Sequence, residues 1–404
     1  MPNFSPRHAL LLLILAGCAE PPSPDPLLGA MENSADRFMR QGLYSQAIQT
    51  YQGAVRQQPE DAELYRKLAE AHDKNGNQEG AVVIYEKAIA LRPDYAKART
   101  ELAFLYTRLD RYDDAFSQLH QAISVQPDYA WAHMILGLLH FREGRYPEAL
   151  AAYRQALAAE PEYGEAWFNL GEVHLKQNDY TAAAQAYRRA IDADSTRARY
   201  RNGLGSSHYR RRDYAVAAAQ FTRAVQLDSL FAQAHFNLGN ALLRTGEKEE
   251  GRRRLAIYKE LNDQENRIEG MKYTLLSQPD NAQVYHDLGV IYGQRGQYRE
   301  AAIQYRQAIA RDSTFAPAHH NLGNIYLRAG RLEEAVQRFH QALRADSTYA
   351  LSHLALGNAH MMDKQYDHAI DRFRRGLRHA PDNARLRRNL TLALEIQAAA
   401  RGGQ

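Results

Sequence analysis

Residues 316–347 read APAHHNLGNIYLRAGRLEEAVQRFHQALRADS, and this stretch decides the fold. Its small and apolar residues recur three, four and seven positions apart, which predicts two short amphipathic helices on either side of a turn at Ala329-Gly330-Arg331. Gly330 suits the left-handed backbone that ends a helix, and Asp346-Ser347-Thr348 is predicted to offer a side-chain oxygen to the amides that open the next helix. A hairpin of this size cannot bury its own apolar face, so copies of it must stack.

The pattern returns every 34 residues over nearly the whole chain, with a Leu-Gly or Leu-Ala pair in each first helix and an Ala that opens each second helix. The nine pairs begin at Leu68, Leu102, Leu136, Leu170, Leu204, Leu238, Leu288, Leu322 and Leu356. The period and the alternation of small and large residues resemble the tetratricopeptide repeat family over roughly residues 28 to 397. The resemblance implies an all-α fold, a right-handed superhelix of about ten helix-turn-helix repeats with a C-terminal capping helix.

One interval breaks the period, because 50 residues instead of 34 separate Leu238 from Leu288. Gly251 stands where an Ala should open the second helix, and apolar residues keep helical spacing up to Leu275. We predict one long helix from about Glu247 to Ser277; a break near Asn262, giving an extra third helix, is the alternative. After Pro381 a lone helix is predicted, with this apolar stripe: Leu386, Leu390, Ala393 and Leu394.

The chain begins MPNFSPRHALLLLILAGCAE, which differs from the repeats. Arg7 precedes an apolar run that is too short to span a bilayer. The following Leu-Ala-Gly-Cys, which ends at Cys18, is similar to the lipobox of bacterial lipoproteins. That resemblance implies cleavage before Cys18 and acylation of this cysteine; the alternative is an ordinary secretory signal. A proline-rich stretch follows, typical of a semi-rigid spacer.

These features predict five segments and a location. We expect a signal peptide at 1–17, a lipidated cysteine and tether at 18–30, a repeat block at 31–246, an irregular helix at 247–278, and a second repeat block with its capping helix at 279–404. The anchor implies the bacterial cell envelope. Because Ala19 and not Asp follows the cysteine, the sorting rule of enteric bacteria favours the periplasmic face of the outer membrane.

Composition and motifs exclude several functions. The 51 basic and 47 acidic residues give a net charge of +4, which supplies no argument for nucleic-acid binding. A Gly-rich phosphate loop, an HExxH motif and a nucleophile elbow are all missing. We therefore predict a protein that is not an enzyme and has no cofactor, metal or small-molecule substrate. The histidines recur at equivalent repeat positions, which favours packing over metal binding.

Two rows of polar residues recur on the first helices, which line the concave groove in this family. The first row consists of Asn169, Asn237, Asn240, Asn321, Asn324 and Asn358. It is similar to the asparagine ladder of O-linked N-acetylglucosamine transferases, and that resemblance implies amides that pair with an extended peptide backbone. A hydrophilic groove lining without a dedicated ligand is the alternative.

The second row is basic and ends the first helices: Lys74, Arg108, Arg142, Lys176, Arg210, Arg244 and Arg328. It predicts either stabilisation of helix C-termini or an electropositive strip for acidic segments. Together the rows predict a membrane-anchored scaffold that binds extended or helical segments of partner proteins, acidic ones among them. A glycan- or peptidoglycan-binding protein is the alternative, with Phe168, Phe236 and Tyr209 as its aromatic candidates.

Overall fold

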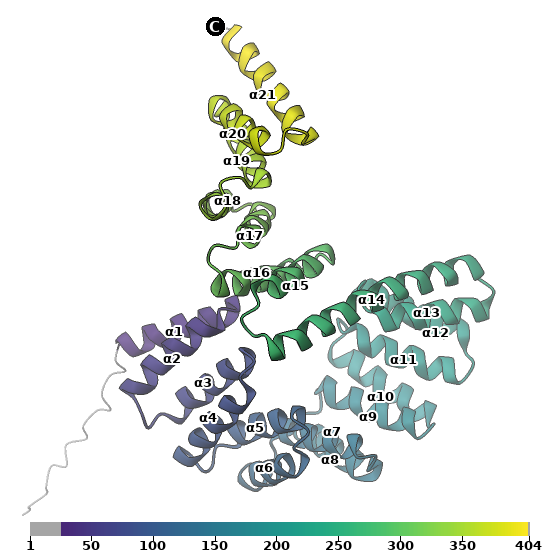
Figure 1. Cartoon of the computed structure of the whole chain (residues 1–404). Helices are drawn as coiled ribbons and strands as arrows, with labels where there is room; N and C mark the ends of the chain where they lie inside the picture. The colour runs from purple at the N-terminus through teal and green to yellow at the C-terminus, as the bar shows by residue number, and fades with distance from the viewer. Residues whose placement is uncertain (1–25, 403–404) are drawn as a thin grey trace, which may run out of the picture.

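In a computed structural model, the described residues 26–402 form 21 α-helices and no strand, which confirms the all-α fold class (Figure 1). Twenty of the helices form ten consecutive pairs, and each pair packs on the next. The first helices are α1 (Pro26–Gln41), α3 (Ala62–Lys74), α5 (Ala96–Arg108), α7 (Ala130–Arg142), α9 (Gly164–Lys176), α11 (Ala198–Arg210), α13 (Ala232–Thr245), α15 (Ala282–Gln294), α17 (Ala316–Arg328) and α19 (Ala350–Met362). The second helices are α2 (Tyr44–Gln57), α4 (Gln78–Leu91), α6 (Tyr112–Val125), α8 (Tyr146–Ala159), α10 (Tyr180–Ala193), α12 (Tyr214–Leu227), α14 (Lys248–Ser277), α16 (Tyr298–Arg311), α18 (Leu332–Ala345) and α20 (Tyr366–His379).

In six of the ten pairs, a glycine of the first helix faces a large ring of the second helix. A Cβ atom added to Gly171 would lie 2.8 Å from the Tyr187 ring, and one added to Gly323 would lie 2.6 Å from the Phe339 ring. Tyr187 and Phe339 are fully buried. The Leu-Gly pair and the aromatic residue of the repeat are therefore complementary halves of one contact, because the missing side chain makes room for the ring.

The turns inside the pairs share one left-handed residue at the same repeat position. Gly330 has a φ of 73°, which confirms its predicted role. Six of these turns have glycine, and the other four use Asp110, Asn178, Arg212 and Lys364. The last two lack the short polar side chain that tolerates this backbone best, so they hold the turn at some conformational cost.

The prediction for Asp346 was wrong in its target. Its carboxylate accepts from the amide of Thr348 (2.9 Å) and from the Thr348 hydroxyl (2.6 Å), both in the loop before α19. Tyr349, which directly precedes α19, makes no side-chain hydrogen bond to the helix. The aspartate instead closes a tight turn, as Asp312 does with Thr314.

The irregular stretch is a single helix, α14, of 30 residues. At a rise of 1.5 Å per residue it spans about 45 Å. Its first half packs on α13, where Gly251 and Gly239 allow close contact between the two backbones. Its second half contacts α15, through Ile268 against Leu288 and Ile291. The helix thus connects the repeat block that ends with α13 to the repeat block that begins with α15.

The pairs from α1 to α13 follow an arc, and α14 runs back across it so that α16 lies beside α1 and α2 (Figure 1). Three side chains of α16 donate to carbonyls at the end of α1: Gln307 to Gly42 (2.7 Å), Arg306 to Gln41 (3.0 Å) and Arg299 to Arg40 (3.4 Å). The last carbonyls of a helix have no partner within the helix. We call this contact the seam, and it closes the first eight pairs into a ring.

The last described helix, α21 (Ala384–Gly402), packs on α20 and lies far from the ring (Figure 1). Leu386 and Ala393 are buried and Leu390 is partly buried, as the apolar stripe predicts. Leu394 is exposed, so the prediction that it belongs to the buried stripe was wrong. The helices that cover the stripe are α20 and α19. Within residues 26–402, no helix is both long and apolar enough to cross a membrane.

Candidate functional site

A pocket of about 710 Å³ lies along the first helices α9, α11 and α13, which contact one another directly. We call it the groove pocket. Its lining includes Phe168, Glu172, Asn202, Arg210, Phe236 and Asn237. Three residues predicted from the sequence therefore come together here, since Asn240 also lines the pocket beside Asn237 and Arg210.

The asparagines of the groove pocket are already tied to the repeats. The Asn237 amide nitrogen donates to Asn202 Oδ1 (2.9 Å), and the Asn237 oxygen accepts from Gln233 (3.0 Å). The Asn240 amide donates to the Phe236 carbonyl of its own helix (2.9 Å). Because an amide has two donor hydrogens and two acceptor lone pairs, each keeps capacity for a ligand while these bonds fix its orientation.

The other predicted asparagines lie outside the groove pocket and serve as links between repeats or turns. Asn169 contacts Met134 Sδ (3.7 Å), and the Asn321 amide lies 3.0 Å from His286 Nε2. Asn324 contacts His320 Nε2 (3.0 Å) on its own helix. Asn358 accepts from Asn389 of α21 (2.7 Å). The six asparagines therefore do not form one continuous strip.

The members of the basic row differ in their contacts, and most of those with a described contact fall into two kinds. Arg108 forms an ion pair with Asp73 of the preceding repeat (2.7 Å), and Arg142 donates to the Thr107 carbonyl near the end of α5 (3.4 Å). Such contacts fit the helix-terminus interpretation. Arg210 and Arg244 are exposed, and neither has a carboxylate within ion-pair distance among the described residues.

Arg328 belongs to neither kind. Its guanidinium lies over the Tyr298 ring, 4.9 Å from the centroid. This cation–π contact orients the side chain on α17, away from the groove pocket. Arg210 is thus the member of the basic row that combines exposure with a place in the groove pocket.

Aromatic rings form the apolar part of the groove pocket. Phe236 is 38% exposed and packs on Tyr258 of α14, with ring centroids 5.0 Å apart. Phe168 lies against Tyr200 (5.4 Å) and below the Arg199 guanidinium (4.7 Å). The pocket therefore offers rigid apolar surface next to a cation, an arrangement that suits an amphipathic segment.

A carboxylate also faces the groove pocket. Glu172 Oε1 accepts from the Tyr187 hydroxyl (2.6 Å). Burial, together with the charge and the hydrogen bond of Glu172, raises the pKa of Tyr187, so the hydroxyl remains a proton donor. Glu172 is held in place as an acceptor, and the pocket presents both signs of charge.

The histidines occupy packing positions, as their repeat spacing predicts. The rings of His133, His235, His319 and His353 each place Nε2 within 2.8–3.1 Å of a carbonyl six residues earlier in the chain. Trp167 makes the same contact with the Pro161 carbonyl (2.8 Å). Over residues 26–402, no group of three or more His, Cys, Asp or Glu side chains is arranged to hold a metal ion.

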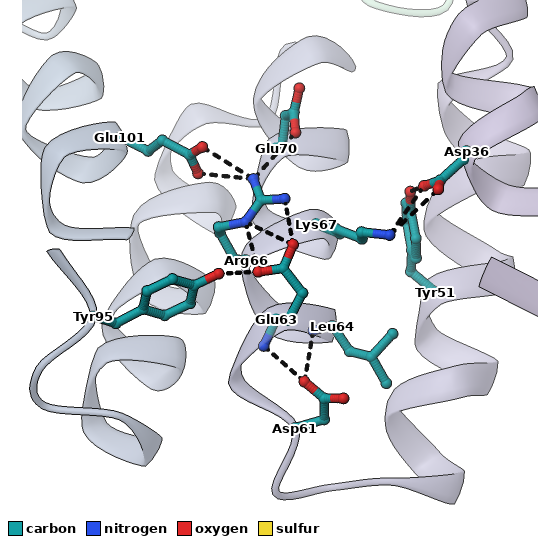
Figure 2. A network of polar contacts seen from close by, with 10 residues as sticks. All are labelled: Asp36, Tyr51, Asp61, Glu63, Leu64, Arg66, Lys67, Glu70, Tyr95 and Glu101. Atoms are coloured by element: carbon teal, nitrogen blue, oxygen red, sulfur yellow. Dashed lines mark hydrogen bonds and ion pairs between the residues drawn. The ribbon is translucent and has the colours of Figure 1, made fainter. Parts of the chain in front are cut away.

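A buried ion network links the second and third repeats and was not predicted (Figure 2). Beside it, Lys67 of the second repeat pairs with Asp36 of the first (3.3 Å). Arg66 is 5% exposed and contacts Glu63 (2.7 Å), Glu70 (3.4 Å) and Glu101 (3.0 Å). The Tyr95 hydroxyl donates to Glu63. The carboxylates thus surround one guanidinium, which satisfies its planar array of donors.

A spacing of 35 residues is the signal that could have revealed this network. Glu101 contacts Arg66, and Asn237 contacts Asn202, 35 residues earlier in each case. Each first helix after α1 has one Leu of the Leu-Gly or Leu-Ala pair. The residue directly before this Leu contacts the residue that lies two positions before the equivalent Leu of the preceding repeat. The Asn row considers the residue before the Leu and the residue after the Gly, so Arg66 and Asn202, two residues before the Leu, were missed.

Cys18, the predicted lipidation site, lies outside the described residues, and so does most of the predicted tether. Its role stays a prediction. The described chain begins with α1 at Pro26, which is inside the range predicted for the tether.

Family profiles for the tetratricopeptide repeat match residues 33–96, 94–161, 140–198 and 202–258, and a profile described as TPR repeat matches 291–330 and 323–364. No curated protein matches the sequence significantly. Similar solved structures include MamA 41-end from Desulfovibrio magneticus RS-1 (21% identity, 42% of this chain and 96% of that chain, TM-score 0.38). Another is YrrB, titled a TPR protein with an unusual peptide-binding site (18% identity, 58% and 95%, TM-score 0.29). The profile matches cover most of the ten helix pairs and show that the chain belongs to the tetratricopeptide repeat family.

Proposed function

We propose that this protein is a non-enzymatic scaffold, lipid-anchored in the bacterial cell envelope, which binds a segment of a partner protein in the groove pocket. Tetratricopeptide repeat proteins serve as protein–protein interaction scaffolds. The observation that carries the proposal is the meeting of exposed Phe236, unpaired Arg210 and two oriented asparagines in one cavity. The groove pocket brings together three of the predicted site residues, Arg210, Asn237 and Asn240.

The chemistry of the pocket indicates the kind of segment. An apolar side chain of the partner would pack on Phe236 and Phe168, where desolvation supplies most of the binding energy. A carboxylate beside it would pair with Arg210, while Asn237 and Asn240 would bond to the backbone. Because Arg210 is exposed, its contribution should fall as salt rises.

A photocrosslinker placed at Phe236 tests the groove pocket in intact cells. We expect one partner protein to be crosslinked, and we expect Arg210→Glu in the same chain to lower the yield several-fold, more so at low salt. The matched control places the crosslinker at Leu227, an equally exposed apolar residue at the end of α12. Equal crosslinking yields from the two positions would contradict the proposal, and so would a yield that Arg210→Glu does not change.

The anchor is tested separately with Cys18→Ser. We expect this variant to move from the membrane fraction to the soluble fraction and to lose incorporation of radiolabelled palmitate, because the thiol is the predicted acyl acceptor. Several acyl chains would hold the native protein stably, at about 0.8 kcal/mol per buried methylene. An unchanged membrane fraction after Cys18→Ser would refute the lipid anchor while leaving the groove pocket untouched.

A second candidate function is glycan binding, because Phe168, Tyr209 and Phe236 all line the groove pocket. Aromatic faces stack on sugar rings as they do on apolar side chains. Sedimentation with purified peptidoglycan separates the two functions: retention that is lost with Phe236→Ser would favour the glycan, and no retention would favour the protein segment.

A further inference from the structure

The ring has a second large cavity, about 1280 Å³ in volume, next to the seam. Its walls come from the α3–α4 turn and α5 on one side and from the end of α14, α15 and α16 on the other. The two sides are about two hundred residues apart in the chain, so the cavity exists only while the ring is closed. We call it the seam cleft.

The seam itself is specific. A Cβ atom on Gly42 would lie 2.6 Å from Ile303 of α16, and the φ of 71° at Gly42 also favours glycine. Gln307 is buried and donates to the Gly42 carbonyl (2.7 Å). A smaller cavity of about 270 Å³, lined by both Ile303 and Gln307, shares Lys74 and Arg311 with the seam cleft. Closure of the ring therefore sets the distance between the walls of the cleft.

The seam cleft exposes apolar side chains that nothing in the described chain covers. Leu276, near the end of α14, is 77% exposed, and Phe104 of α5 is 39% exposed. Leu275, which directly precedes Leu276, also lines the cleft. The position of Phe104 in its repeat is polar in most other repeats, Glu70 and Glu172 among them, and apolar in two, at Leu138 and Val290. An apolar pair facing a wide cleft is typical of a place where a partner inserts a side chain.

The seam cleft is lined by more cations than carboxylates. Its lining has four cations, Lys74, Arg108, Lys272 and Arg311, and two carboxylates, Asp73 and Asp280. Arg108 already pairs with Asp73 (2.7 Å). Arg311 is held over the Tyr285 ring at 4.6 Å. Lys74 is exposed and has no carboxylate within ion-pair distance among the described residues.

We propose that the seam cleft is a second binding site, which takes an acidic peptide segment carrying a large apolar side chain. The apolar side chain packs between Phe104 and Leu276, and a flanking carboxylate pairs with Lys74. Lys272 already pairs with Glu269 of its own helix (2.8 Å) and adds only to the positive field of the cleft. A nucleic acid fits the cleft less well, because Asp280 and the exposed leucine interrupt the cationic surface that a phosphate backbone follows. Binding couples to ring closure, since the ligand contacts both walls.

The test uses the purified full-length chain and a fluorescein-labelled decapeptide of alternating leucine and glutamate, followed by fluorescence anisotropy. We expect Lys74→Glu and Leu276→Ser each to weaken binding about tenfold, which corresponds to about 1.4 kcal/mol. Both side chains are exposed, so both variants should fold. The matched controls are Lys176→Glu, at the same repeat position on α9, and Leu227→Ser, and neither should change the affinity.

A third variant, Ile303→Glu, opens the seam. It should raise the radius of gyration measured by small-angle scattering, and it should weaken binding of the peptide as much as Leu276→Ser does. The proposal is overturned if Lys176→Glu weakens binding as much as Lys74→Glu, if Leu276→Ser has no effect, or if oligo-dT competes as well as the peptide. Loss of binding only with Arg210→Glu would place the peptide in the groove pocket instead, which would support the proposed function and refute the seam cleft.

Discussion

Replacing Arg66 with alanine should destabilise the second and third repeats by about 3 kcal/mol, the lower end of the range found when one partner of a buried ion pair is removed, because only Glu101 among its partners is well buried. Arg66 is almost fully buried and is bonded to Glu63, Glu70 and Glu101. Without it these carboxylates face one another, and Glu101 keeps little access to water. Water reaches Glu63 and Glu70 but hardly reaches Glu101, so added salt should restore only part of the stability.

Hydrogen exchange is the suitable measurement, because a repeat array unfolds by neighbouring units and not as one block. In Arg66→Ala, amides of α3, α4 and α5 should exchange faster, while those of α19 and α20 should not change. Arg188→Ala is the matched control: Arg188 is exposed on α10, and its loss should stay within about 0.5 kcal/mol. Equal exchange in native and Arg66→Ala chains would show that the network adds no stability.

Acidification from pH 6.5 to pH 4 should destabilise the second repeat block, and His320 should account for a large part of the effect. This ring is buried, with Nδ1 3.0 Å from Ser352 Oγ and Nε2 3.0 Å from the Asn324 amide. Because the amide donates to Nε2, the ring is neutral and Nδ1 carries its proton. Burial lowers the pKa of His320 from 6.5 to about 4, which corresponds to about 3 kcal/mol.

The sign follows from proton binding. Between pH 4 and pH 6.5 the unfolded chain binds a proton at His320 and the folded chain does not, so stability falls as the pH falls, by up to about 1.4 kcal/mol per pH unit. Above pH 6.5 the contribution is fully present. Burial also lowers the pKa of His72, His140, His174, His235, His319, His340 and His353, which adds to the slope in the same direction.

Thermal melting of His320→Gln against pH tests this assignment. Glutamine keeps one donor and one acceptor but does not titrate, so the melting temperature should depend less on pH between 6.5 and 4 than in the native chain. His368→Gln, on the exposed surface of α20, is the matched control and should keep the native slope. A slope that is identical in all three chains would contradict a role for His320 in acid sensitivity.

The groove residues show how far sequence alone could reach. The spacing of Asn237, Asn240 and Arg210 indicated first-helix positions, and the structure places all three in one pocket. Arg328 follows the same spacing, yet its side chain stacks on Tyr298 and lies elsewhere. Spacing gives the side of a helix, but the direction of a long flexible side chain depends on which neighbour it meets.

Local chemistry in the sequence was sufficient to determine the repeat. The 34-residue period, the Gly-and-aromatic pairing and the left-handed turn at Gly330 all follow from contacts within one or two helices, whereas for α14 the spacing left one helix or two open and the structure shows one. Those interactions join residues close in the chain, so pattern and spacing predict them.

Only the tertiary structure decided that the chain closes on itself. The contact of Gly42 with Ile303 and Gln307 joins residues more than 250 positions apart. It depends on small rotations that accumulate from one repeat to the next and on the direction in which the long α14 leaves the arc. No single repeat encodes that sum. The seam, and the cleft beside it, are therefore properties of the whole array.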